Sequence, residues 1–206
     1  MGDRPCKTDI ATMPTTRFIR HLRFFLMAII LVNLMLPASI LAETSAVLAN
    51  IRLANTRDDL LTYFEVRNAF TDSIMEAIQK GVPTTFSFYV SLSKRTNTLF
   101  DKTLADIKIQ STIKYNSMKE EYTVSRPWRD DKPVMTKSLE EAKEWMTEVD
   151  NLKVVPLADL TKGDKYLLRI KAELEKVTLP LSLHYVFFFV SFWDFETDWY
   201  VINFTY

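Results

Sequence analysis

The sequence predicts an α+β, β-rich domain: an antiparallel sandwich or strongly curved sheet with two short helices, preceded by an N-terminal hydrophobic helix. Three observations lead to this expectation. Apolar residues recur at every second position in most segments, which is typical of half-buried strands. Short polar turns join neighbouring segments, which favours antiparallel pairing. Only two segments beyond residue 42 show helical spacing together with a helix start or stop signal.

The first elements are a hairpin and a helix. Apolar residues alternate over residues 47–53, a polar turn follows, and alternation resumes over residues 60–70, so the two segments should pair. Thr71 or Asp72 is expected to cap a short helix, and Gly81 is expected to end it because glycine readily adopts the left-handed conformation of a helix terminus.

The middle of the chain continues as strands joined by turns. Residues 86–92, 107–115 and 122–124 alternate in the same way, with a turn at Asn116 and Ser117 between the last two. Residues 126–133 are polar and bounded by proline, so they are expected to form an exposed loop.

The second half supplies the other helix and the last strands. Ser138 and Glu141 have the spacing of a capping box at the start of a helix. Strands are predicted over residues 152–157, 166–174 and 200–206, the last with aromatic and branched side chains at alternate positions.

Residues 1–42 have the order of an export segment. A basic stretch at residues 17–23 precedes an apolar run beginning at Phe24, and small residues follow up to Ala42, as in a secretory signal. Cleavage near Ala42 would release a periplasmic domain. Retention is the alternative, because residues 24–41 are just long enough to cross a bilayer as a helix.

Both alternatives place residues 43–206 outside the inner membrane, since the basic residues stay on the cytoplasmic side. Met13 is an alternative start to Met1. The exported part has 164 residues, which suits one domain with a single core. It holds 21 basic and 24 acidic residues and therefore lacks the broad basic surface that nucleic acid requires.

Several chemistries are excluded by residue counts in the exported part. The only cysteine, Cys6, lies before the export segment, so the domain has no disulfide and no thiolate metal ligand. Two glycines do not make a phosphate-binding loop, and a single histidine, His184, does not make a paired-histidine metal site. We expect no nucleotide and no cofactor.

Three groups of residues are candidates for binding. Residues 184–193 are almost continuously apolar and are interpreted as a buried strand or short core helix, a lipid-contacting surface, or a partner groove, with Phe187, Phe189 and Trp193 as candidate contacts. Trp128 in the predicted loop is a further candidate contact, unless it packs on the body of the domain.

The third group is acidic. Asp194, Glu196 and Asp198 alternate and would share one face of an extended segment. The interpretation favoured here is a polar turn whose acids are solvated or paired with basic residues. A calcium site would lack the usual loop glycine and distal glutamate, and acid/base chemistry would lack an obvious second group.

Four stretches resemble a known family. EAIQKGVPTTF at residues 76–86, IKY at 113–115, LPLSL at 179–183 and WDFETDWY at 193–200 together resemble the bacterial domain-of-unknown-function family 4390 over about residues 45–206. The resemblance implies an envelope protein of a Gram-negative or related bacterium with an N-terminal hydrophobic segment. It implies no activity, cofactor or catalytic residue.

We therefore expect a non-enzymatic, periplasmic or membrane-tethered binding or accessory module. Its partner would be an envelope protein or a lipid, and its N-terminal segment would contact the membrane. One alternative is a carboxylate-dependent hydrolase or lyase that uses His184 as well. Another is a structural or assembly component of the envelope.

Overall fold

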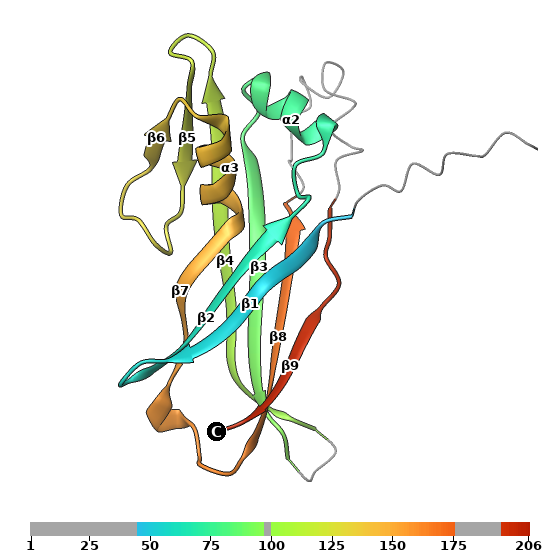
Figure 1. The fold of residues 1–206 in the computed structure, drawn as a ribbon, viewed down its shortest axis with the longest axis vertical. Helices are drawn as coiled ribbons and strands as arrows, with labels where there is room; N and C mark the ends of the chain where they lie inside the picture. Colours follow the sequence, from blue (N-terminus) through green and yellow to red (C-terminus); the bar gives the residue numbers. More distant parts are fainter. Residues whose placement is uncertain (1–44, 97–99, 176–194) are drawn as a thin grey trace, which may run out of the picture. The chain divides into compact units, whose positions relative to one another are not determined.

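The computed structural model describes residues 45–96, 100–175 and 195–206 (Figure 1). The chain divides into a unit of residues 1–43 and a unit Thr44–Tyr206, and everything described belongs to the second. The expected hydrophobic helix, the export segment and the cleavage position near Ala42 lie outside the described residues. In the described ranges the two α-helices have eight and nine residues, and none is long and apolar enough to cross a membrane.

The described chain is dominated by strands. In chain order the elements are β1 (Val47–Asn55), β2 (Asp59–Arg67), α2 (Asp72–Gln79), β3 (Thr84–Lys94), β4 (Lys102–Asn116), β5 (Glu121–Ser125), β6 (Val134–Thr136), α3 (Leu139–Thr147), β7 (Glu148–Pro156), the 3-10 turn η1 (Leu157–Asp159), β8 (Lys165–Leu174) and β9 (Tyr200–Thr205).

These strands form two antiparallel sheets, one in the order β1-β2-β7 and one in the order β6-β5-β4-β3-β8-β9. The smaller sheet crosses the long strands β3, β4 and β8 of the larger one (Figure 1). Phe64 on β2 meets Phe88 on β3 edge to face, with ring centroids 5.8 Å apart. The predicted β-rich antiparallel fold with two short helices is confirmed.

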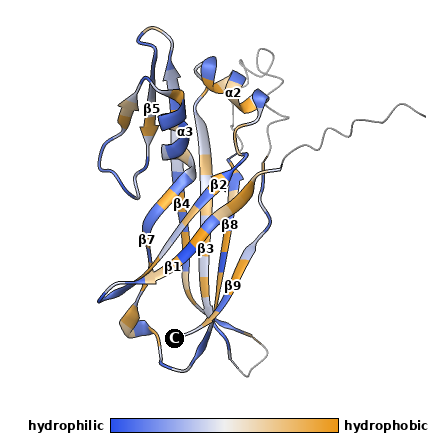
Figure 2. Cartoon of the chain, in the orientation of Figure 1, coloured by the Kyte–Doolittle hydropathy of each residue, from blue (hydrophilic) through white to orange (hydrophobic). Residues whose placement is uncertain are grey.

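The core follows from the alternation in the sequence. In Figure 2 apolar and polar residues alternate along the strands. The four apolar residues predicted for β3 are fully buried, as are four on β8: Phe86, Phe88, Val90 and Leu92, with Tyr166, Leu168, Ile170 and Ala172. Each fully buried large apolar side chain contributes about 1.5–3 kcal/mol, so these two central strands supply much of the stability.

Helix α2 begins and ends as predicted. The Thr71 hydroxyl accepts a hydrogen bond from the backbone N–H of Ile74, at 3.4 Å. At the other end Gly81 has a φ of +79°. Its N–H donates to the carbonyl of Ile78 at 2.8 Å, while Val82 N–H donates to the carbonyl of Ala77 at 3.0 Å. This pair of bonds is a Schellman motif, which satisfies carbonyls that the helix leaves unpaired.

Helix α3 has half of the predicted capping box. The Ser138 hydroxyl accepts from the N–H of Glu141 at 3.3 Å. The return bond is replaced: the N–H of Ser138 donates to the hydroxyl of Thr136 at 3.0 Å, and that hydroxyl donates to the Glu141 carboxylate at 2.5 Å. The Thr136 hydroxyl therefore stands between the Ser138 N–H and the Glu141 carboxylate, which would bond each other directly in a capping box.

Strands β7 and β6 differ from the prediction. The strand expected at residues 152–157 is β7, which starts earlier, at Glu148 directly after α3. The prediction missed this start because the first residues of β7 include the irregular Asn151, with a φ of +54°, and show no clean alternation. Strand β6 was not predicted. Three residues are too few for a period of two to be recognised.

Candidate functional site

The segment before β9 is attached to β8 by bonds of alternating direction. Leu174 N–H donates to the carbonyl of Phe195 at 2.9 Å, and Thr197 N–H donates to the carbonyl of Ala172 at 2.9 Å. The Thr197 hydroxyl also accepts from Ala172 N–H, at 3.0 Å. Phe195 is buried and meets Phe86 edge to face at 4.8 Å. Phe195 and Thr197 therefore fix this segment to the body of the domain.

The alternate side chains, Glu196 and Asp198, are exposed. They lie beside a charged strip of β8 that consists of Arg169, Lys171 and Glu173. Glu196 forms an ion pair with Lys171, which also lies 3.3 Å from Glu173. The cations of Arg169 and Lys171 lie 5.6 and 5.8 Å from the ring centroid of Trp199. Cations at such distances are attracted to the face of an indole. Trp199 is thus held in place at the surface.

Electrostatics in this strip follow from its hydrogen bonds. The hydroxyl of Tyr89 donates to the Glu173 carboxylate at 2.6 Å, and this bond is the main reason that the pKa of Glu173 is lowered. The same bond raises the pKa of Tyr89. The pKa of Lys171 is raised, chiefly by its bond to Glu196. All three groups therefore keep their ordinary charge at neutral pH.

A groove lies between this segment and the start of β1. We call it the edge groove; its volume is about 420 Å³, and it is lined by residues 45–48 and 196–200. It lies where both sheets end, because β1 is the border of the smaller sheet and β9 that of the larger. Val47, Trp199 and Tyr200 are 44–46% exposed there, so three large apolar side chains gather around one groove.

The acidic candidates do not converge into a chemical centre in the part that is described. Glu196 and Asp198 both line the edge groove, Glu196 pairs with Lys171, and Asp198 is exposed. Asp194 lies outside the described residues. Among residues 45–96, 100–175 and 195–206, no group of three or more His, Cys, Asp or Glu side chains is placed to hold a metal ion.

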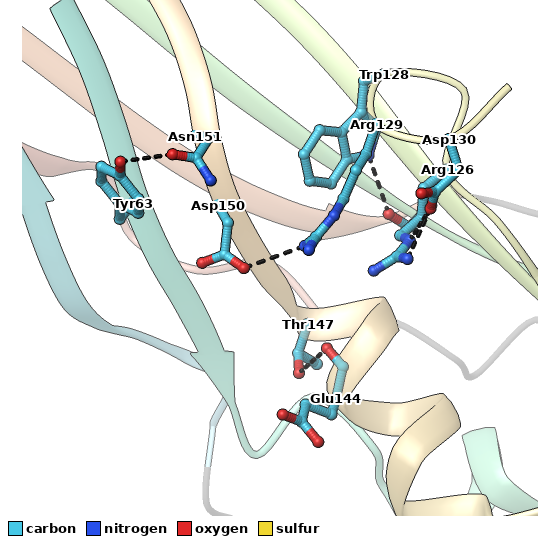
Figure 3. Close-up of polar contacts among 10 residues, drawn as sticks. Tyr63, Arg126, Trp128, Arg129, Asp130, Glu144, Thr147, Asp150 and Asn151 are labelled. Atoms are coloured by element: carbon cyan, nitrogen blue, oxygen red, sulfur yellow. Dashed lines mark hydrogen bonds and ion pairs between the residues drawn. The ribbon is translucent and has the colours of Figure 1, made fainter. Parts of the chain in front are cut away.

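Trp128 lies in a second hollow, on the outer side of β7 (Figure 3). We call it the Trp128 pocket; its volume is about 340 Å³, and it is lined by residues 128–129 and 150–153. The indole N–H of Trp128 donates to the hydroxyl of buried Ser111 at 3.3 Å. Trp128 is only partly exposed and packs against the core, so its indole is committed to the body of the domain.

The polar groups around this pocket are paired with one another (Figure 3). Arg129 lies 3.1 Å from Asp150, and the Tyr63 hydroxyl donates to the side-chain oxygen of Asn151 at 2.6 Å. Arg126 is 6% exposed and bonds Asp130 at 2.6 Å. The predicted exposed loop at residues 126–133 is therefore anchored by a buried arginine, which its polar composition did not indicate.

The other sequence candidates, Phe187, Phe189, Trp193 and His184, lie outside the described residues. The sequence candidates Glu196 and Asp198 line the edge groove, but its exposed large apolar residues, Val47, Trp199 and Tyr200, were not predicted. No local pattern indicated the exposure of Trp199, because it follows the buried Phe195 and Thr197 in the same alternation.

No curated protein and no solved structure matches the chain. The stretch WDFETDWY, which carries the family resemblance, includes the buried Phe195 and Thr197 and the groove residues Trp199 and Tyr200. A family model described as "Domain of unknown function (DUF4390)" matches residues 43–203, which is more than half of the chain. The chain therefore belongs to the DUF4390 family.

Proposed function

We propose that this protein is a non-enzymatic accessory module of the cell envelope that binds a protein partner in the edge groove. The observation that carries the proposal is the exposure of Val47, Trp199 and Tyr200 around one groove of about 420 Å³. Large apolar side chains gathered at a concave surface are typical of binding sites.

The chemistry of the groove supports binding rather than catalysis. Among the described residues, the groove carboxylates have no partner of the kind that acid/base catalysis uses: Glu196 is neutralised by Lys171, and Asp198 is exposed to solvent. The rim instead combines an indole flanked by two cations with a tyrosine and a valine. Aromatic residues and arginine are the side chains that most often dominate protein interfaces.

The order of the chain supports a location near the membrane. The hydrophobic segment expected at residues 24–41 is followed after three residues by Ser45, which lines the groove. An extended chain spans about 3.3–3.6 Å per residue, so an anchor ending at Leu41 would keep the groove close to the bilayer. A partner in the same membrane, or one attached to it, would reach the groove directly.

A lipid is the second candidate partner, because the apolar residues 184–193 precede the groove lining directly in the chain. Among the described residues on either side of this stretch, Glu173 and Glu196 form an isolated β-bridge. Phe187, Phe189 and Trp193 would contact the lipid in this case. The protein partner is preferred because the groove itself is lined by paired charges as well as apolar groups.

The test is crosslinking in cells that carry the native gene. A photoreactive amino acid is placed at Val47 or at Trp199, on opposite walls of the groove, and at Met135 as a control. Met135 is 61% exposed but lies on β6, at the far border of the larger sheet. We expect the two groove positions to capture the same protein and the control position not to capture it.

A matched pair of variants tests whether the groove itself is recognised. With the photoreactive residue at position 47, Trp199→Ser should abolish capture, while Met135→Ser should leave it unchanged. Equal capture from all three positions would contradict the proposal. Crosslinks to lipid alone, from both walls of the groove, would replace the protein partner with a membrane surface.

A further inference from the structure

The described chain has four strands at sheet borders: β1 and β7 in the smaller sheet, and β6 and β9 in the larger one. A border strand presents unpaired backbone N–H and C=O groups to which another chain can pair. Folded proteins prevent such pairing with bulges, charged residues, prolines, short strands or a covering loop. The four borders differ in how far they use these devices.

Three borders are protected. Strand β1 has a register shift between Ala49 and Arg52, where Asn50 has a φ of +51°. Strand β7 has two register shifts, and the Arg129–Asp150 ion pair joins it to the neighbouring loop. Strand β6 has three residues and follows Pro133.

Within residues 45–96, 100–175 and 195–206, strand β9 has none of these protections. Its sequence YVINFT contains no charged residue and no proline. It pairs with β8 in continuous register over six residues, from Ile170 opposite Tyr200 to Lys165 opposite Thr205. Within the described residues β8 is the strand it pairs with, and it forms the border of the sheet opposite β6 (Figure 1).

The side chains of β9 alternate between two environments. Ile202, Phe204 and Tyr206 are partly buried and pack against the core, and Phe204 stacks on Tyr166 with centroids 5.6 Å apart. Val201 and Asn203, on the other face, are exposed. A strand added alongside β9 must therefore place apolar residues on the core side and small or polar residues on the outer side.

We propose that the occupant of this border is β9 of a second copy of the chain, paired antiparallel about a two-fold axis at Asn203. In this register Ile202 lies opposite Phe204, and Tyr200 lies opposite Tyr206, all on the core side. On the outer face Val201 lies opposite Thr205, and Asn203 faces its own copy, where two amide side chains can exchange hydrogen bonds.

The charge pattern favours a copy as the occupant. Like charges directly opposite each other destabilise a strand pair, and self-pairing doubles every charge that a border strand carries. The protected borders β1 and β7 would place Arg52, Asp150 or Lys153 in new pairs, whereas β9 brings no charge to the pairing. The result is one continuous sheet through both copies, with a closed two-fold interface that does not propagate.

Disulfide trapping tests the register. The full chain carries one natural cysteine, Cys6, which is first changed to serine. Directly opposed residues of an antiparallel pair have Cα atoms about 4.5–5.5 Å apart, within the range of a disulfide. Asn203→Cys should therefore give a covalent dimer on mild oxidation.

Two further cysteine variants check that the crosslink depends on register. Thr205→Cys alone should give little covalent dimer, because the two copies of residue 205 would lie about 14 Å apart at 3.4 Å per residue. Mixing it with Val201→Cys should restore the crosslink between the two variants.

A charge variant tests the unmodified assembly. The detergent-solubilised full chain should have twice the 24.0 kDa mass of one copy by light scattering, and Asn203→Lys should halve it. Met135→Lys, at the exposed border strand β6, should leave the mass unchanged. A monomeric mass for the unmodified chain, together with no covalent dimer from Asn203→Cys, would overturn the proposal and leave the edge groove proposal standing.

Discussion

Gly81→Val should lower the free energy of unfolding by about 1–2 kcal/mol, because the cost of a left-handed backbone for a residue with a side chain is roughly that large. Gly81 has a φ of +79° and ends α2 through the Schellman motif. A Cβ atom at this position would lie 3.5 Å from the backbone oxygen of Tyr115, which is an ordinary contact. The cost is therefore conformational rather than a clash.

The predicted loss corresponds to a fall in Tm of roughly 2–8 °C, since 1 kcal/mol shifts the Tm of a domain of this size by about 2–4 °C. Urea denaturation followed by circular dichroism gives the free energy, and a thermal scan gives the Tm. Gly81→Asn is the matched variant, because asparagine tolerates the left-handed region better than valine. It should lose distinctly less stability.

Gly163 supplies an independent comparison. Its φ is +86°, and a Cβ added there would have no atom of the described residues within 4 Å, so Gly163→Val tests the backbone cost without a close neighbour. Similar losses at both glycines would support a conformational origin. Unchanged stability of Gly81→Val would refute both the cost assigned to the helix end and the boundary of α2.

Three further predictions concern hydrogen bonds and charge. Thr197→Val should cost about 1–3 kcal/mol in thermal unfolding, because the N–H of Ala172 loses its acceptor in a buried place; Thr197→Ser should retain most of the stability. Tyr89→Phe should cost about 1 kcal/mol at pH 7. Since the Tyr89 bond lowers the pKa of Glu173, this loss of stability should shrink as the pH falls through that lowered pKa. Urea titrations at pH 7 and pH 3 measure the loss, and an equal loss at both pH values would contradict the prediction. Partial burial and then nearby carboxylates raise the pKa of Glu148, so its ionised form opposes folding once the pH exceeds that raised pKa. Glu148→Gln should therefore stabilise the protein by about 0.3 kcal/mol at pH 7 after allowance for solvent screening, and the gain should disappear at pH 4.

Most strands and both helices were predictable because each depends on local information. The alternation of Phe86, Phe88, Val90 and Leu92 requires only that one face of a strand be buried, and the structure buries all four. Thr71 and Gly81 likewise bracket α2 through bonds to residues only three to five positions away. The capping box was half right because its completion depends on Thr136, a residue of the unrecognised β6.

The candidate site was harder to predict because it depends on which strands are neighbours. The edge groove combines residues 45–48 with residues 196–200, and no local pattern indicates that the first and last strands meet at one side. The environment of Trp128 was also hard to predict, because it depends on a residue distant in the sequence. Its loop is polar in sequence, but the partner of its indole N–H is Ser111, which lies 17 positions earlier on β4.

The order of the larger sheet has a consequence for how the chain folds during synthesis. Strands β3, β4 and β5 each pair with the next strand in the sequence, so this half can form as soon as it emerges. The remaining side of β3 pairs with β8, for example Tyr89 with Lys171, and that strand is made some eighty residues later. Until then the edge of β3 that pairs with β8 has no neighbouring strand. Non-local closure of this kind is slow and leaves surface open to aggregation, so we expect the nascent chain to be open to aggregation until β8 has been made.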